Sequence, residues 1–145
     1  ERSLLIDCDV LQADGGTRTA SVTGAFVALA LACGRIHARG DLERNPLCES
    51  VAAVSVGLLD GETRLDLPYE EDARADVDMN VVGTGSGQLI EVQGTGEGAT
   101  FSADELTELT SLALGGIATL TALQKEAVLS AGLEWPLVGA LGERD

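Results

Sequence analysis

The first long apolar pattern along the chain follows a short extended run. Residues 4–11 place Ile6, Cys8 and Val10 on one face, which predicts a strand. Residues 19–38 carry apolar side chains three and four positions apart, which predicts a long helix. Because alanines fill much of its remaining surface, we expect this helix to be largely buried against a sheet. Its apolar positions are Val22, Phe26, Leu29, Ala30, Cys33 and Ile36.

Four shorter runs in the middle of the chain predict strands. Residues 51–59 are apolar on both faces, as in a central strand that is covered on both sides. An Asp-Gly turn leads from it to a return strand over residues 63–67. Residues 77–82 alternate in polarity, and 88–93 follow a glycine-rich turn. We expect these last two runs to form a hairpin that pairs antiparallel with the preceding strands.

A second long helix follows the strands. Ser102 and Glu105 form a capping box before it, and Gly132 and Pro136 end it. The element order predicts an α/β (α+β) fold, a mixed sheet with two long helices packed on it. We assign residues 1–131 to this domain and leave the tail 132–145 unassigned. The predicted buried stripe of the helix is Leu106, Leu109, Ala113, Ile117, Leu120, Leu123 and Ala127.

Composition narrows the possible functions. The chain has 9 basic and 24 acidic side chains and a formal charge of −15, which argues against binding nucleic acid by itself. The three cysteines are widely spaced, so buried free thiols in a reducing cytoplasm are expected. No apolar run is judged long and charge-free enough to span a membrane, so no membrane partner is expected.

Residues 14–21, Asp-Gly-Gly-Thr-Arg-Thr-Ala-Ser, lie between the first strand and the first helix. Two glycines permit a tight turn, and the hydroxyls of Thr17, Thr19 and Ser21 are placed to cap the first helical turn. Helix N-termini attract anions, and Arg18 adds a forked cation suited to phosphate. The segment matches neither a nucleotide P-loop nor a dinucleotide fingerprint. We interpret it as a phosphate site, with an ordinary turn as the alternative.

Five carboxylates lie within nine residues, from Glu70 to Asp78. Most such clusters are solvated acidic turns. Asp78, however, lies on a predicted strand between apolar neighbours, where an isolated charge is costly. Asp72, in the turn before it, can fold back to the same side. A converging carboxylate pair suits Mg²⁺, which completes its shell with water and substrate phosphate.

Four segments carry a resemblance to a known family. Residues 7–21, Tyr69-Glu70-Glu71-Asp72, residues 77–82 and Glu91-Val92-Gln93-Gly94-Thr95 closely resemble the signature of ribonuclease PH. The match runs in order from the first residues to about Ala127.

The resemblance implies a phosphate-dependent 3′→5′ exoribonuclease of the nucleotidyltransferase type. Such an enzyme trims transfer RNA 3′ ends, releases nucleoside diphosphates and assembles as a hexameric ring, a trimer of dimers. By position, Thr17 and Arg18 resemble the residues that hold the attacking phosphate, and Asp72 and Asp78 the pair associated with Mg²⁺ and acid catalysis. Gly16, Thr19 and Ser21 would shape the helix N-terminus. Which aspartate binds metal and which donates a proton stays open.

Compared with a whole ribonuclease PH, the chain begins well advanced in the family sequence. We therefore expect it to be the C-terminal part, active when completed by an N-terminal part that supplies more of the basic RNA surface. A non-catalytic ring subunit or truncated remnant with an assembly role is the main alternative. A stand-alone anion- or metal-binding module is a third.

Overall fold

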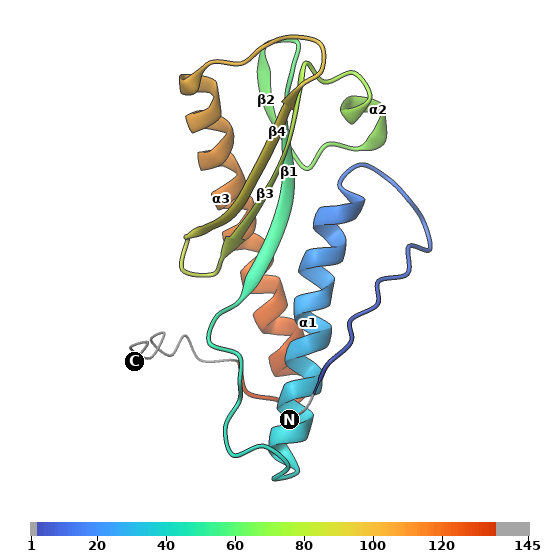
Figure 1. The fold of residues 1–145 in the computed structure, drawn as a ribbon, viewed down its shortest axis with the longest axis vertical. Helices are drawn as coiled ribbons and strands as arrows, with labels where there is room; N and C mark the ends of the chain where they lie inside the picture. Colours follow the sequence, from blue (N-terminus) through green and yellow to red (C-terminus); the bar gives the residue numbers. More distant parts are fainter. Residues whose placement is uncertain (1–2, 136–145) are drawn as a thin grey trace.

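A computed structural model of the protein describes residues 3–135. Four strands form one sheet in the order β2-β1-β3-β4, with every neighbouring pair antiparallel (Figure 1). The predicted α/β class with two long helices packed on a sheet is confirmed. The sheet was predicted to be mixed, but in the described residues it is wholly antiparallel, because its strands are joined by hairpins or by returns to the neighbouring strand. The elements are α1 (Thr17–Ala38), β1 (Val51–Leu59), β2 (Glu62–Leu65), α2 (Tyr69–Asp72), β3 (Val77–Thr84), β4 (Leu89–Gly96) and α3 (Ala103–Ser130).

The sheet follows the predicted hairpins. Asp60 and Gly61 have φ angles of 53° and 78°, the left-handed pair that a two-residue turn between β1 and β2 requires. β1 is the central strand, and eight of its nine residues are buried. The hairpin of β3 and β4 also forms, with β3 paired to β1 along Val77–Thr84.

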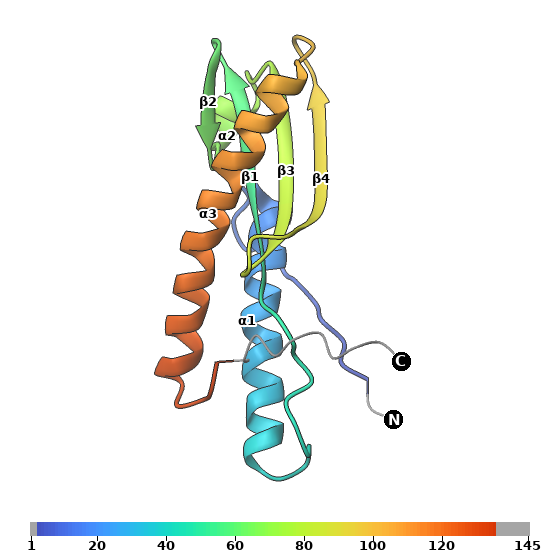
Figure 2. The ribbon, with the colours of Figure 1, turned by 90° about the vertical axis from the view of Figure 1, so that its left-hand side faces the viewer.

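The main core lies between the sheet and α3, which crosses the strands in Figure 2. Side chains at alternate positions of β1 and β3 meet those of α3, as the strand period requires. Gly116 allows α3 to approach closely, since a Cβ there would lie 2.9 Å from Leu65 Cδ1. The core residues are Ala52, Val54, Val56, Leu58, Val77, Met79, Val81, Leu109, Ala113 and Ile117.

Below the short strand β2, the two long helices cover the edge of β1. Thr23 Oγ1 of α1 donates to the Ala53 carbonyl and accepts from the Ala53 N–H, both at 3.0 Å. Gln124 of α3 donates to the Val51 carbonyl at 3.0 Å and to the Thr23 carbonyl at 2.9 Å. These contacts satisfy strand groups that β2 does not reach. They also tie α1 to α3 beside the first residues of β1, and beyond this point both helices continue past the strands (Figure 1).

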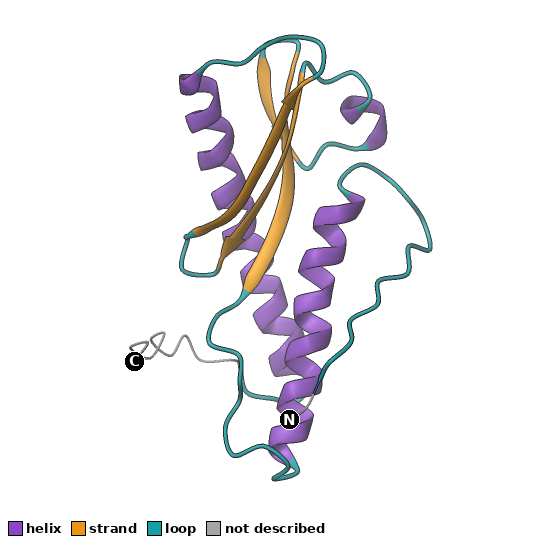
Figure 3. Cartoon of the chain, viewed as in Figure 1, coloured by secondary structure: helices purple, strands orange, loops and turns teal. Residues whose placement is uncertain are grey.

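The predicted strand over residues 4–11 does not form. The chain from residue 3 to the start of α1 is a loop (Figure 3). A strand needs a hydrogen-bonding neighbour, and no described residue of this chain pairs with the segment. Instead it runs beside α1, with Cys8 Sγ 3.9 Å from the Ser21 carbonyl oxygen, and Leu5 and Leu11 are 97% and 94% exposed.

The buried stripe of α3 is narrower than predicted. Leu106 and Leu123 are 36% and 57% exposed, and Ala127 is also exposed. Gln124 and Val128 are buried in their place. The stripe changes because the C-terminal half of α3 packs against α1 and the edge of β1 instead of the sheet face. The side of the helix that is buried there is the one that carries Gln124 and Val128.

The first helix is also less buried than its alanine content indicates. Only Thr19, Phe26, Ala30, Cys33 and Gly34 of α1 are buried. By length and composition, α1 and α3 are both apolar enough to cross a membrane, so the prediction that no such run exists is wrong by that measure. Core helices of globular proteins meet the same measure, and both helices pack on the sheet here.

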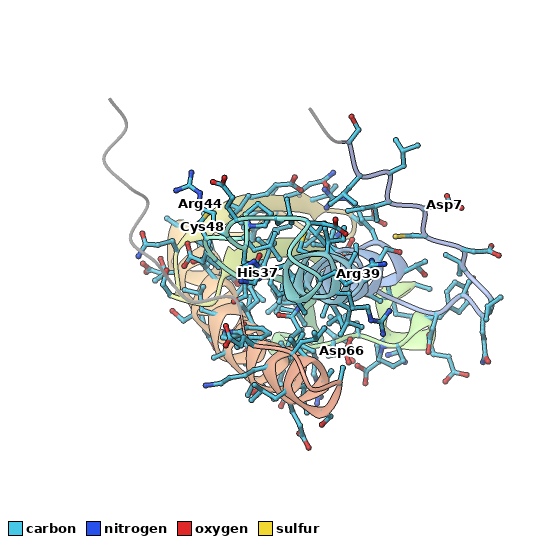
Figure 4. The ribbon with its side chains drawn as sticks, turned by 90° about the horizontal axis from the view of Figure 1, so that it is seen from below. Asp7, His37, Arg39, Arg44, Cys48 and Asp66 are labelled. Carbon is cyan, nitrogen blue, oxygen red and sulfur yellow. The ribbon has the colours of Figure 1, made fainter. Side chains whose placement is uncertain are left out.

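Of the three cysteines predicted to be buried, only Cys33 is. Burial raises the pKa of its thiol. Cys8 and Cys48 are exposed, Cys8 in the loop before α1 and Cys48 at the end that Figure 4 shows from below. All three are free thiols, as predicted.

The only histidine of the chain, His37, makes a structural contact at the C-terminal end of α1. His37 lies in its last turn, and its Nδ1 is 2.9 Å from the Leu42 carbonyl, which ties the following loop to the helix (Figure 4). A helix of 22 residues is about 33 Å long, so His37 is remote from the first turn of α1.

The start of the unassigned tail packs on α1. Phe26 and Trp135 make an edge-to-face aromatic pair with ring centroids 5.8 Å apart. Leu133 covers Gly34, where a Cβ would lie 3.1 Å from Leu133 Cδ1. The rest of the predicted tail, residues 136–145, lies outside the described residues.

Candidate functional site

The first turn of α1 begins without a side-chain cap. Gly16 is the N-cap residue, with φ 70°, and the first turn carries no acidic side chain. The predicted hydroxyl caps do not form. Thr17 Oγ1 donates to the Asp14 carbonyl at 2.8 Å, and Thr19 Oγ1 donates to the Gly16 carbonyl at 2.7 Å. Ser21 Oγ donates to the Thr17 carbonyl at 2.9 Å.

These hydroxyls therefore brace the turn instead of capping it. No side chain caps the backbone N–H groups of the first turn, and no carboxylate of that turn neutralises the positive end of the helix dipole. The arrangement suits an anion approaching the helix axis from outside. The contrast with α3 is direct, because Ser102 and Glu105 complete a capping box there, as predicted.

Two contacts join the turn before α1 to α2. Gly15 lies against the backbone of Leu67 and Pro68, so closely that a Cβ would overlap the Leu67 carbonyl oxygen. Asp14 Oδ1 accepts from the Gly15 N–H at 2.8 Å and from the Tyr69 N–H at 2.7 Å. The bonds from Tyr69 and Gly15 lower the pKa of Asp14. Figure 1 shows the resulting arrangement, with α2 beside the start of α1.

The register of the sheet shows which side chains share this side of the molecule. Val77, Met79 and Val81 face α3, so Asp78 and Asn80 lie on the opposite face. In the antiparallel register, Asp78 pairs with Gly57 of β1 and Thr95 of β4. Asn80 pairs with Ser55 and Gln93, and Val82 pairs with Ala53 and Glu91. The face away from α3 therefore carries a band of polar side chains across three strands, which we call the polar face.

Arg18 reaches across to this polar face. Its Nη2 atom donates to Glu91 Oε1 at 2.7 Å and to Oε2 at 3.0 Å. Glu91 pairs with Val82, which lies four residues from Asp78 along β3. At the rise of a strand, the two positions are about 13 Å apart. Arg18 and Asp78 thus share one face, at opposite ends of a polar strip with Asn80 between them.

The other end of the strip is acidic. The pKa of Asp78 is raised, first by partial burial and then by the negative charges of Asp72 and Glu97. The structure thus places Asp72, from the last turn of α2, close enough to Asp78 to repel it. Glu97 follows β4 and adds a third negative charge. Mutual repulsion between partly buried carboxylates is relieved by protonation or by a cation.

The acidic end of the strip offers Mg²⁺ two carboxylates, those of Asp72 and Asp78. Within residues 3–135, no group of three or more His, Cys, Asp or Glu side chains is arranged to hold a metal ion. Mg²⁺ commonly takes one or two protein carboxylates and keeps water and substrate phosphate as its other ligands. Asp72 and Asp78 fit that smaller donor set, and the raised pKa of Asp78 is consistent with a cation there.

Ser55 lies beneath the turn. It is 3% exposed, and its Oγ has no hydrogen-bond partner among the described residues. A Cβ on Gly16 would lie 3.1 Å from this oxygen. Buried hydroxyls are nearly always hydrogen-bonded. The unpartnered Ser55 hydroxyl next to the N-terminus of α1 is therefore available to a ligand bound there.

We expect Ser55→Ala to leave the stability of the protein unchanged or slightly higher, since it removes a hydroxyl that no described residue binds. Thr23→Val, which removes two hydrogen bonds to Ala53, is the matched comparison. It should cost about 1–3 kcal/mol. Urea unfolding of both variants measures the difference. If Ser55→Ala lost more unfolding free energy than Thr23→Val, the Ser55 hydroxyl could not be unpartnered in the folded protein.

Sequence reasoning did not identify four residues of this region. Asp14 and Glu91 lie inside quoted motifs, but their partners Tyr69 and Arg18 are 55 and 73 positions away. Glu97 and Ser55 gain their importance from the sheet register. The predicted roles of Thr17, Arg18, Asp72 and Asp78, and of Gly16, Thr19 and Ser21, stay predictions; the structure shows where these residues lie.

Comparisons with known proteins show that this fold is similar to that of the 3′ exoribonucleases. Residues 49–116 match the model of the 3′ exoribonuclease family, domain 2. A solved structure of rice (Oryza sativa) Rrp46 has the same fold, with a TM-score of 0.57 over 77% of this chain and 47% of that chain, at 18% identity.

Relatives in sequence are more specific. The chain is 58% identical over 127 residues to ribonuclease PH of Synechococcus sp. (strain CC9605), covering 88% of this chain and 51% of that protein. It is 59% identical over 129 residues to ribonuclease PH of Mycobacterium tuberculosis (strain ATCC 25618 / H37Rv), with 88% and 50% covered. The resemblance to ribonuclease PH is confirmed over 88% of this chain. The chain spans about half the length of these relatives.

Proposed function

We propose that the protein contributes the phosphate- and metal-binding half of a phosphorolytic 3′→5′ exoribonuclease. The carrying observation is that Arg18, from an uncapped helix N-terminus, reaches the sheet face that carries Asp78, where Asp72 of α2 repels the Asp78 carboxylate. The relation to ribonuclease PH supports phosphate as the attacking group and RNA as the substrate. Transfer RNA 3′ ends are the specific substrate that we propose.

The anion end of the site would orient the nucleophile. The first-turn N–H groups of α1 and the guanidinium of Arg18 offer donors to an inorganic phosphate, and the braced hydroxyls of Thr17 and Thr19 keep the turn rigid. Ser55 supports this position as a ligand site, because it adds a buried, unpartnered hydroxyl beneath Gly16. Positioning and charge stabilisation supply most of the rate in phosphoryl transfer.

The acidic end would handle the leaving group. In the proposed reaction a phosphate oxygen forms a bond to the terminal phosphorus, the bond to the 3′ oxygen breaks, and that oxygen takes a proton. Asp72 and Asp78 are the residues that would hold Mg²⁺, which when bound supplies charge neutralisation at the phosphoryl oxygens. A carboxyl whose pKa is raised, as in Asp78, is also suited to hold the proton that the 3′ oxygen needs.

RNA binding would require a second surface. With a formal charge of −15, the chain itself repels a polyanion. We propose that the basic contacts come from the remaining half of a ribonuclease PH-like protein and from neighbouring subunits of a ring. The exposed Leu5 and Leu11, and the apolar side chains of the edge strand β4, fit such packing.

The test is phosphorolysis of an RNA with a transfer RNA 3′ end. One arm uses the protein alone, and the other adds the remaining half of a related ribonuclease PH, made separately. We expect nucleoside diphosphates in the second arm, and only when inorganic phosphate and Mg²⁺ are present. A verified complex that releases no nucleoside diphosphate would overturn the proposal, and nucleoside monophosphates would indicate hydrolysis instead.

An assembly role without catalysis is the second candidate, favoured by the exposed apolar side chains of the segment before α1. It gives a different result with phosphate alone. A catalytic half should melt at a higher temperature in millimolar phosphate, because a ligand that binds the folded state stabilises it. A purely structural subunit should show no such shift, while still forming oligomers in sedimentation.

A further inference from the structure

Glu91 holds Arg18 by one nitrogen only. Both carboxylate oxygens accept from Nη2, at 2.7 and 3.0 Å, and among the described residues Arg18 makes no other side-chain hydrogen bond or ion pair. A guanidinium has five N–H donors, two of them on Nη2. Three donors, on Nε and Nη1, are therefore left for another acceptor.

The pair also links two elements, α1 and β4, that no other side-chain hydrogen bond or ion pair joins among the described residues. Arg18 is in the first turn of α1, and Glu91 is on the edge strand β4, 73 positions away. Each side chain is about half exposed, 50% for Arg18 and 43% for Glu91. An exposed ion pair of this kind adds little to stability, so its effect on the position of Arg18 is the larger consequence.

A free arginine side chain samples many rotamers, and a ligand that binds it must restrict them. An arginine already held across the sheet loses less freedom when an anion arrives, which is preorganisation. The competing possibility is that Glu91 acts as an internal anion that phosphate must displace. Because Glu91 contacts only Nη2, the remaining donors of Arg18 stay available while the pair is intact. This favours preorganisation of Arg18 over competition between Glu91 and phosphate.

We infer that Glu91 is a positioning residue: it presents Arg18 to inorganic phosphate at the first turn of α1 without occupying the donors that phosphate uses. The inference rests on the proposed function, because it assigns Arg18 to phosphate. It adds a residue of β4 to a site otherwise built from α1, the turn before it and Ser55 of β1.

The experiment is a titration of the protein with inorganic phosphate by calorimetry, for wild type, Glu91→Ala and Glu91→Gln. We expect the dissociation constant to rise about five- to tenfold in Glu91→Ala, the size expected when ordering of an arginine side chain is added to binding. Glu91→Gln keeps one carbonyl acceptor for Nη2 and should lose about half of that effect on a logarithmic scale. In phosphorolysis, the KM for phosphate should rise while kcat at saturating phosphate changes little.

Glu62→Ala is the matched control. It removes a carboxylate from another exposed pair of 2.7 Å, with Arg64 on β2, and should leave phosphate binding unchanged. An unchanged or tighter dissociation constant in Glu91→Ala would overturn the positioning role. If the wild type itself shows no saturable phosphate binding, the proposed function fails, and this inference fails with it. If the wild type binds phosphate and Glu91→Ala binds it equally well, only this inference fails.

Discussion

Asp78→Asn should raise the melting temperature of the protein at neutral pH and abolish most of its phosphorolytic activity. The charged form of Asp78 is disfavoured by burial and by the charges of Asp72 and Glu97, so a neutral side chain of the same shape relieves that repulsion. We expect a rise of about 1–4 °C by calorimetry. Losing a carboxylate that would hold Mg²⁺ or a proton should lower kcat by about 100-fold or more.

The pH dependence of this stability gain follows from the direction of the shift. A carboxyl whose pKa is higher in the folded than in the unfolded protein binds its proton more tightly when folded. As the pH rises from the ordinary aspartate value of 3.8 through the raised pKa of folded Asp78, the wild type loses stability relative to the variant. The difference should therefore be absent at the acidic side of this window and constant above it.

The control for Asp78→Asn is Asp41→Asn, the same chemical change at an exposed position beyond the far end of α1. It should alter neither the melting temperature nor the activity appreciably. Mg²⁺ gives a second readout, because it should stabilise the wild type more than Asp78→Asn. A variant that melts below the wild type at pH 7, or that keeps full activity, would show that Asp78 is an ordinary structural carboxylate.

The strands and helices were predictable where the local pattern and the final packing agree. Eight of the nine residues of β1 are buried because α1 and α3 both pack against it, and the turn at Asp60 and Gly61 needs the left-handed conformations that such a pair adopts. Residues 4–11 show the limit. Their alternation is that of a strand, but a strand also needs a neighbour, and the described chain provides none.

The site was predictable only in part for a related reason. The glycine turn and the aspartates at 72 and 78 stand in short motifs, so their residue types could be recognised locally. The partners that define their chemistry are distant in sequence, such as Glu91 for Arg18 and Glu97 for Asp78. The hydroxyls of Thr17, Thr19 and Ser21 were expected to cap N–H groups, but each binds a carbonyl instead. Residue type does not distinguish these two uses of a hydroxyl.

Arg18→Ala should remove phosphate binding and lower kcat/KM for phosphorolysis by about 100- to 1,000-fold, the usual loss when one preorganised donor to the reacting group is removed. Its stability should fall by less than about 1 kcal/mol, because the pair that it breaks with Glu91 is half exposed. Arg18→Lys keeps the charge but loses the fork, so it should recover only part of the activity. Steady-state kinetics with varied phosphate, together with urea unfolding, measure both effects.

Arg64→Ala controls for the loss of a surface cation, since it breaks a comparable exposed pair with Glu62 and should leave phosphate kinetics unchanged. The double variant Arg18→Ala/Glu91→Ala closes a thermodynamic cycle. If Glu91 acts through Arg18, the double variant should be no worse than Arg18→Ala, because an absent guanidinium cannot be positioned. Additive losses would instead mean that Glu91 acts on the site independently. If Arg18→Ala kept the phosphate kinetics of the wild type, the proposal that the first turn of α1 binds phosphate would be wrong.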